Sequence, residues 1–159
     1  MKEKTDKTNA MRLLDAAKIP YKTRLYDPEI TLGTEVARLL NEDPDRVFKT
    51  LVCESPNHEH FVFVIPVNAE LDLKKAAKAA KTKSIDLIPQ KELLPLTGYV
   101  HGGCSPIGMK KAFPTFIEES ASLFEAIFVS GGRKGMQIEI SPVDLASYCG
   151  ASLLPLAAF

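Results

Sequence analysis

The 159-residue sequence lacks any apolar run close to the ~18 residues that a membrane-spanning helix requires. Its opening segment, Met1-Lys2-Glu3-Lys4-Thr5-Asp6, is polar and lacks the apolar core of a secretion signal. We therefore expect a cytoplasmic protein. The apolar fraction of 45% and the charged fraction of 25% are ordinary for a globular domain. They exclude a wholly disordered chain, a coiled coil and a collagen-like repeat.

A net charge is also absent, because 20 Lys and Arg residues balance 20 Asp and Glu residues. A neutral chain does not bind nucleic acid through its overall charge. A local basic surface is still possible. Basic residues gather within 74–83, at Lys110-Lys111 and at Arg133-Lys134. Such groups form solvated surfaces or contact phosphates near a substrate pocket, and the sequence leaves both alternatives open.

Cysteine is scarce, and no Cys-x-x-Cys pair occurs among Cys53, Cys104 and Cys149. The odd count and the lack of a secretion signal predict reduced thiols, and the spacing matches no zinc signature. His58-Glu59-His60 lacks further ligands and is predicted to lie in a solvated turn. Cys104 beside His101 suggests a thiolate nucleophile, but no orienting acid is evident nearby. We expect no metal and no other cofactor.

The hydrophobic periodicity predicts an α+β domain. Helices are expected at 8–18, 34–40, 73–80, 90–94 and after the capping Ser141. Strands are expected at 21–26, 47–54, 61–67, 84–88, 115–118, 126–130 and 136–140, with a strand stub at 99–101. Hairpins and helical crossovers alternate, which favours a mixed, strongly curved sheet, a partial barrel, flanked by helices. The length suits one domain over residues 1–159.

Lys49 is the most informative single residue, because it lies inside an apolar strand. Both faces of Val47-Phe48-Lys49-Thr50-Leu51-Val52-Cys53 are largely apolar, which is typical of a central, buried strand. A lysine is seldom buried without a partner, and a desolvated lysine is typical of functional sites. The alternative is a lysine at a strand end whose ammonium reaches solvent.

Two glycine segments follow predicted strands. In His101-Gly102-Gly103-Cys104-Ser105-Pro106-Ile107-Gly108 the paired glycines would let the backbone approach a ligand closely, and free N–H groups would bind an anion or a carbonyl oxygen. The segment is neither a Walker loop nor a dinucleotide fingerprint. A tight structural turn explains it equally well, and a hairpin turn explains Ser130-Gly131-Gly132.

Three separated segments together resemble the YbaK/EbsC family. They are Arg46-Val47-Phe48-Lys49-Thr50-Leu51, residues 102–111 and Val129-Ser130-Gly131-Gly132. The family comprises bacterial Cys-tRNA(Pro) deacylases, which are similar to the editing insertion domain of prolyl-tRNA synthetase. The resemblance covers nearly the whole chain and includes the Tyr26-Asp27 pair. It implies a YbaK-like aminoacyl-tRNA editing domain over residues 1–159.

The resemblance also implies roles for individual residues. Lys49 would hold a terminal phosphate or ribose oxygen, and Gly102 and Gly103 would direct N–H groups at the aminoacyl carbonyl. The substrate-binding positions it implies are Tyr26, Thr50, Ser105, Ser130 and Gly131. Some relatives carry an acid at the position of Gln137, so this chain departs from the family pattern there.

The activity that the resemblance implies is hydrolysis of tRNA(Pro) mischarged with cysteine. The thiol of the substrate attacks its own ester, while the enzyme positions the group and stabilises the oxyanion. The family also implies a transient complex with prolyl-tRNA synthetase. Two alternatives stay open: a deacylase that removes another small amino acid, such as alanine, with activated water, and a non-catalytic module that binds tRNA or the synthetase.

Overall fold

A computed structural model describes residues 7–159, and the polar segment Met1–Asp6 lies outside the described residues. The helices are α1 (Asn9–Ala16), α2 (Gly33–Leu40), α3 (Leu73–Ala80), α4 (Leu93–Thr97) and α5 (Pro142–Cys149), with 3₁₀ turns η1 (Pro44–Arg46), η2 (Gln90–Glu92) and η3 (Glu119–Leu123). The strands are β1 (Lys22–Leu25), β2 (Phe48–Glu54), β3 (His60–Pro66), β4 (Glu70–Leu71), β5 (Asp86–Leu87), β6 (Thr115–Glu118), β7 (Ile127–Ser130), β8 (Met136–Ile140), β9 (Ser152–Leu154) and β10 (Ala157–Ala158).

Side-chain caps explain where several helices begin. The Thr8 hydroxyl accepts the Met11 N–H, and the Asp72 carboxylate accepts the N–H groups of Lys74 and Lys75. Each cap satisfies a backbone donor that the first helical turn leaves free. The helix starts predicted at these two positions are therefore confirmed.

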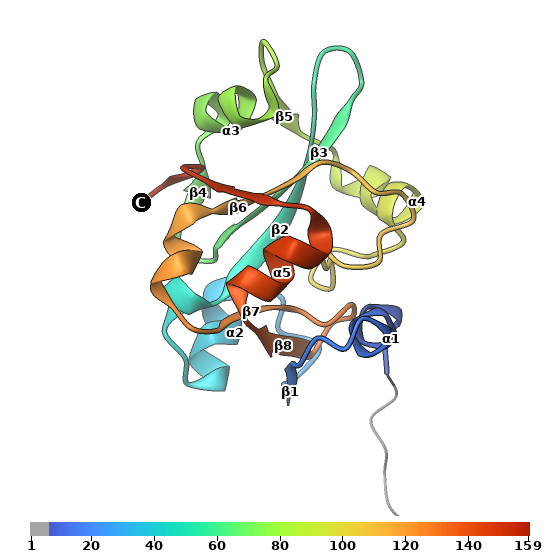
Figure 1. Ribbon diagram of the computed structural model, residues 1–159, viewed down its shortest axis with the longest axis vertical. Helices are drawn as coiled ribbons and strands as arrows, with labels where there is room; N and C mark the ends of the chain where they lie inside the picture. Colours follow the sequence, from blue (N-terminus) through green and yellow to red (C-terminus); the bar gives the residue numbers. More distant parts are fainter. Residues whose placement is uncertain (1–6) are drawn as a thin grey trace, which may run out of the picture.

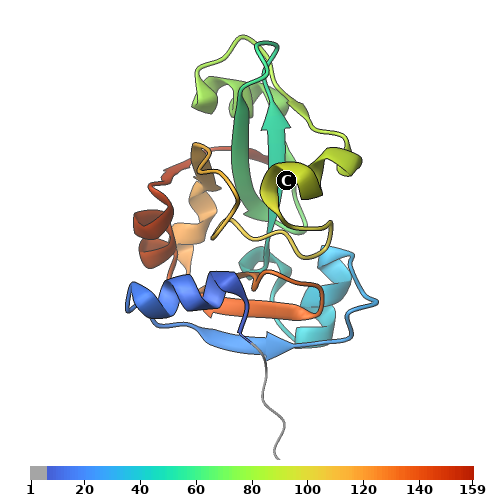
Figure 2. The same ribbon diagram turned by 90° about the vertical axis from the view of Figure 1, so that its right-hand side faces the viewer.

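The strands form three sheets by hydrogen bonding within the described residues. The largest has the order β5-β2-β3-β6-β9, in which β2 runs antiparallel to β3 and β5, whereas β3, β6 and β9 are parallel. A second sheet, β1-β8-β7, is antiparallel, and β10 pairs with β4. Figures 1 and 2 show the β1-β8-β7 sheet with α1 at one end of the molecule and the β2–β3 hairpin extending toward the other.

The α+β class and the mixed sheet are confirmed, but the expected partial barrel is not. In residues 7–159 one isolated bridge, Val47–Phe128, links the two larger sheets, so hydrogen bonds close no barrel. Side chains join these sheets instead. Val64 of the large sheet and Val129 and Ile138 of the small one belong to the same buried cluster. Burying two apolar sheet faces against each other satisfies both without closing a barrel.

Residues 99–101 do not form the predicted strand stub. The Tyr99 N–H donates to the Thr97 hydroxyl at 3.0 Å, and the Gly103 N–H donates to the Val100 carbonyl at 2.9 Å. These local bonds turn the chain, which has no neighbouring strand there in the described part. None of the helices in residues 7–159 is long and apolar enough to cross a membrane.

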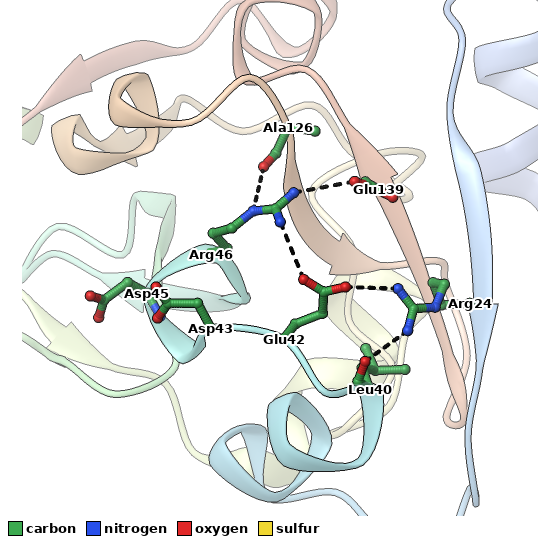
Figure 3. A network of polar contacts seen from close by, with 8 residues as sticks. All are labelled: Arg24, Leu40, Glu42, Asp43, Asp45, Arg46, Ala126 and Glu139. Carbon is green, nitrogen blue, oxygen red and sulfur yellow. Dashed lines mark hydrogen bonds and ion pairs between the residues drawn. The ribbon is translucent and has the colours of Figure 1, made fainter.

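A polar network braces the junction between the two larger sheets. One carboxylate oxygen of Glu42 contacts Arg24 of β1 at 3.0 Å, and the other contacts Arg46 of η1 at 3.2 Å (Figure 3). Arg46 continues to Glu139 of β8 at 3.2 Å. Both guanidinium groups also lie over the Phe128 ring, 5.7 and 5.2 Å from its centroid. The network therefore ties β1, β8 and the start of β2 together.

Candidate functional site

A cavity of about 380 Å³ lies where the start of β2 meets the small sheet. Segments far apart in the sequence contribute to it: residues 26–36, the start of β2, the glycine loop at 101–104 and the β7–β8 pair. The structure brings together five of the residues predicted for the site, which are Tyr26, Lys49, Thr50, Gly102 and Ser130.

Three predicted site residues do not line this cavity. Gly103 belongs to the glycine loop but packs against the backbone of Arg133 and Lys134. Ser105 is fully buried and accepts the Ile107 N–H through its hydroxyl. Gly131 accepts the Thr8 hydroxyl and donates its N–H to the Met136 carbonyl. The family resemblance implied a site role for these residues, and the structure gives each an internal bonding or packing role.

Lys49 is half-buried at the cavity and lies mid-strand, opposite Ile65 of β3. It forms no ion pair among the described residues, and none of the residues that line the cavity is an aspartate or glutamate. Burial lowers the pKa of its ammonium, which the negative field of Glu70 partly opposes. A desolvated cation without a carboxylate nearby favours an anionic or strongly polar ligand.

The edge of β2 is open where it passes the cavity. The Ile88 N–H donates to the Val52 carbonyl, so the backbone groups of Val52 point toward the β5 side. Backbone direction alternates along a strand, so those of Thr50 point the same way. β5 pairs with β2 at Cys53 and Glu54, and in the described part no strand covers Thr50. The Thr50 N–H and C=O therefore lie on the unpaired edge of β2, and Thr50 itself lines the cavity.

The Thr50 hydroxyl is unsatisfied: its oxygen is buried and has no hydrogen-bond partner within the described residues. A buried hydroxyl without a hydrogen-bond partner lowers the free energy of unfolding, so Thr50 destabilises the folded protein at this position. Sequence reasoning identified Thr50 but missed the open strand edge, which depends on how short β5 is.

The two glycines of the loop have different roles. Gly102 has a φ of +89°, and a Cβ there would lie 2.8 Å from Thr31 Cγ2. Its N–H has no acceptor among residues 7–159, so it is free to bind a ligand oxygen. Gly103 already donates its N–H to Val100, and a Cβ there would lie 2.9 Å from the Arg133 Cα. Gly103 therefore serves close packing between two loops.

Ser130 and Gln137 form a neutral polar wall of the cavity. They are cross-strand partners of β7 and β8, so their side chains lie next to each other on one face. The Ser130 hydroxyl accepts the Gly132 N–H at 3.1 Å, and the Gln137 Oε1 is buried without a partner in the described part. The sequence singled out Gln137 through its departure from the family pattern, and the structure places it in the cavity.

Cys104 lines the cavity but is not suited to be a nucleophile. Burial raises the pKa of its thiol to about 12, so the thiol stays protonated near neutral pH. His101 is exposed at the mouth. The exposed His58 lies in the turn before β3 and contacts Glu54 at 2.9 Å, away from the cavity. The predicted solvated turn is confirmed for His58 and Glu59, but His60 begins β3 and is partly buried against the Phe113 ring.

Comparisons with known proteins identify a family for this chain. The model of a family described as the aminoacyl-tRNA editing domain matches residues 27–148. A protein of Enterococcus faecalis, provisionally named Cys-tRNA(Pro)/Cys-tRNA(Cys) deacylase EbsC, is 48% identical over 149 residues, which cover 92% of this chain and 91% of that protein.

Solved structures share the fold at low sequence identity. One is described provisionally as a trans-editing enzyme for prolyl tRNA synthetase, with a TM-score of 0.82, 20% identity, and coverage of 98% of this chain and 100% of that one. Another is the hypothetical protein APE2540, with a TM-score of 0.86, 21% identity, and coverage of 92% and 97%.

Proposed function

The chain belongs to the YbaK/EbsC family of aminoacyl-tRNA editing domains, and from this premise we propose that it is a trans-editing deacylase that removes cysteine from mischarged tRNA(Pro). The observation that carries the proposal is the half-buried Lys49, without an ion-pair partner among the described residues, in a cavity that no acid lines. A synthetase that selects by size rejects an amino acid of similar size poorly, so a second site is required. Residues 1–159 act as one such editing domain.

The proposed chemistry uses the thiol of the substrate. Its sulfur attacks the ester carbonyl, a C–S bond forms, and the C–O bond to the ribose breaks. The thiol proton passes to the departing ribose oxygen, and water later opens the thiolactone. This route requires no protein nucleophile, which agrees with the protonated Cys104 thiol in the cavity. The enzyme supplies positioning and charge stabilisation.

Each cavity residue has a proposed task in that reaction. The Lys49 ammonium holds a phosphate or ribose oxygen of the terminal nucleotide, and the free Gly102 N–H donates to the carbonyl oxygen as it gains charge. Tyr26, Thr50 and Ser130 form the walls around the aminoacyl group.

The test is release of cysteine from Cys-tRNA(Pro) by the purified protein in reducing buffer, against a blank without protein. Lys49→Ala should abolish release, and Lys78→Ala on α3, outside the cavity, should leave it unchanged. Loss of ester at the blank rate with the wild-type protein would contradict the proposal and favour a binding module. Full activity of Lys49→Ala would remove Lys49 from the mechanism.

A transient complex with prolyl-tRNA synthetase is part of the proposal. A formally neutral chain selects tRNA weakly through bulk electrostatics, so a partner that binds the tRNA body would supply selection. The expected result is co-purification of the synthetase in the presence of tRNA. No association at micromolar concentrations of both proteins would contradict this part.

A further inference from the structure

A basic hairpin, residues 131–135, stands at the rim of the cavity. It joins β7 and β8 and carries Arg133 and Lys134, whose side chains are exposed. Neither forms an ion pair within the described residues. Within residues 7–159, no carboxylate therefore neutralises these two adjacent cations in an ion pair.

Close backbone contacts fix one side of the basic hairpin to the glycine loop. A Cβ on Gly103 would lie 2.9 Å from both the Arg133 Cα and the Lys134 nitrogen, so the two loops touch through their backbones. A Cβ on the cavity-lining Gly102 would lie 3.6 Å from the Lys134 Cγ. The stem of Lys134 therefore passes directly beside the cavity wall.

The other side of the basic hairpin is fixed to a second wall. The Tyr26 N–H donates to the Gly135 carbonyl at 3.0 Å, and Tyr26 lines the cavity. Gly135 has a φ of +83°, and a Cβ there would lie 2.9 Å from the Tyr26 carbonyl oxygen. The hairpin is thus held between two cavity walls. A turn that only contacts solvent would not need such close backbone contacts.

The lysines of α3 provide a contrast within the same chain. Lys74, Lys75 and Lys78 are exposed on one helix that contributes nothing to the cavity, and Lys75 donates to the Ala157 carbonyl at 3.0 Å. They fit the description of a solvated helix face. Arg133 and Lys134 differ because they lie beside a cavity that contains Lys49 and that no acid lines.

We propose that the basic hairpin binds the phosphodiester backbone of the single-stranded nucleotides that directly precede the esterified nucleoside. This rests on the proposed function, because it takes the aminoacyl ester to occupy the cavity. With the terminal nucleotide in the cavity beside Lys49, the phosphates of the preceding nucleotides pass over the rim, where a guanidinium and an ammonium are available. Two cations supply local attraction that the neutral chain as a whole does not.

The first measurement is direct binding, which needs no catalysis. A labelled single-stranded oligonucleotide ending in CCA is titrated with wild-type protein, with an Arg133→Gln/Lys134→Gln variant and with a Lys74→Gln/Lys78→Gln control. We expect the hairpin variant to bind about tenfold more weakly, as two exposed ion pairs would supply. The slope of its log affinity against log salt concentration should also become shallower by about 1.4, at about 0.7 for each lost phosphate contact on a single strand. Equal affinity of the hairpin variant and the wild type would overturn the proposal.

The second measurement compares two esters of cysteine. One is the ester of adenosine, which has no phosphate, and the other is the ester of a CCA trinucleotide. The hairpin variant should lose kcat/KM on the trinucleotide and retain it on adenosine. Equal losses on both would mean a distorted cavity and would overturn the proposal. If the wild type binds the oligonucleotide through the hairpin but cleaves neither ester, the proposed function fails and this inference stands.

Discussion

Lys49 combines partial burial with a charge that, in the described part of the chain, no acidic side chain of the cavity balances. Its place in the strand was predictable, because the apolar alternation of residues 47–53 leaves it no solvent face. The cavity that it lines was not predictable, because α2, the glycine loop and β8 form it together and are far apart in the sequence.

Replacement of Lys49 by alanine should lower kcat/KM by about 10²-fold or more, because the terminal nucleotide would lose the charged group that positions its ester. The stability should not fall. Because the fold lowers the Lys49 pKa, the unfolded state binds more protons just below the normal lysine pKa. Wild-type stability should therefore rise with pH in that interval, and Lys49→Ala should lose this rise. Urea unfolding from pH 7 to 10.5 measures it, and identical slopes would contradict it.

A substitution at Cys104 tests whether the attacking thiol belongs to the protein. With its thiol pKa raised to about 12, Cys104→Ser should keep deacylation within about threefold of wild type, and iodoacetamide should label the native thiol slowly at pH 8. A folded Cys104→Ser protein without activity would instead make the protein thiol the nucleophile.

A substitution at Thr50 tests whether its unsatisfied hydroxyl binds the substrate. Thr50→Val removes a buried hydroxyl that has no partner in the described structure, so we expect about 1 kcal/mol more stability and a lower kcat/KM. Thermal unfolding and single-turnover assays measure the two effects. A loss of stability would mean that the hydroxyl is satisfied in the folded protein.

At the scale of elements, much of the fold was predictable from residues that begin or end helices. Asp72 and Ser141 accept backbone N–H groups at the predicted helix starts, and Gly150 ends α5 in the left-handed conformation. The pairing of β4 with β10 was not predictable, because two-residue strands show no periodicity. The division into separate sheets likewise depends on side-chain packing between sheets, which sequence alternation does not specify.

The Glu42 network offers a prediction at this scale. Glu42→Gln removes the charge between Arg24 and Arg46, and these partly buried groups should lose about 1–2 kcal/mol of stability. Glu35→Gln is the matched control on α2. Its pair with Arg38 is exposed and should contribute under about 0.5 kcal/mol. Chemical denaturation compares the two variants, and equal effects would show that the network is not a brace.

At the scale of the molecule, the site depends on convergence. Three sequence segments suggested an editing domain, and the structure brings Lys49, Gly102 and Ser130 from those segments to one cavity. The sequence could not separate the tasks of Gly102 and Gly103, because a glycine required for packing looks the same as one required for ligand approach. Contacts with Thr31 and Arg133 distinguish them in the structure.

The proposed nucleophile is the thiol of the substrate, and one paired measurement distinguishes it from activated water. Cys-tRNA(Pro) and Ala-tRNA(Pro) are incubated in parallel with the purified protein, and loss of each ester is followed against a buffer blank. We expect rapid loss of the cysteinyl ester and loss of the alanyl ester at the blank rate, because alanine has no thiol. Comparable loss of both esters would contradict it and identify a deacylase that activates water.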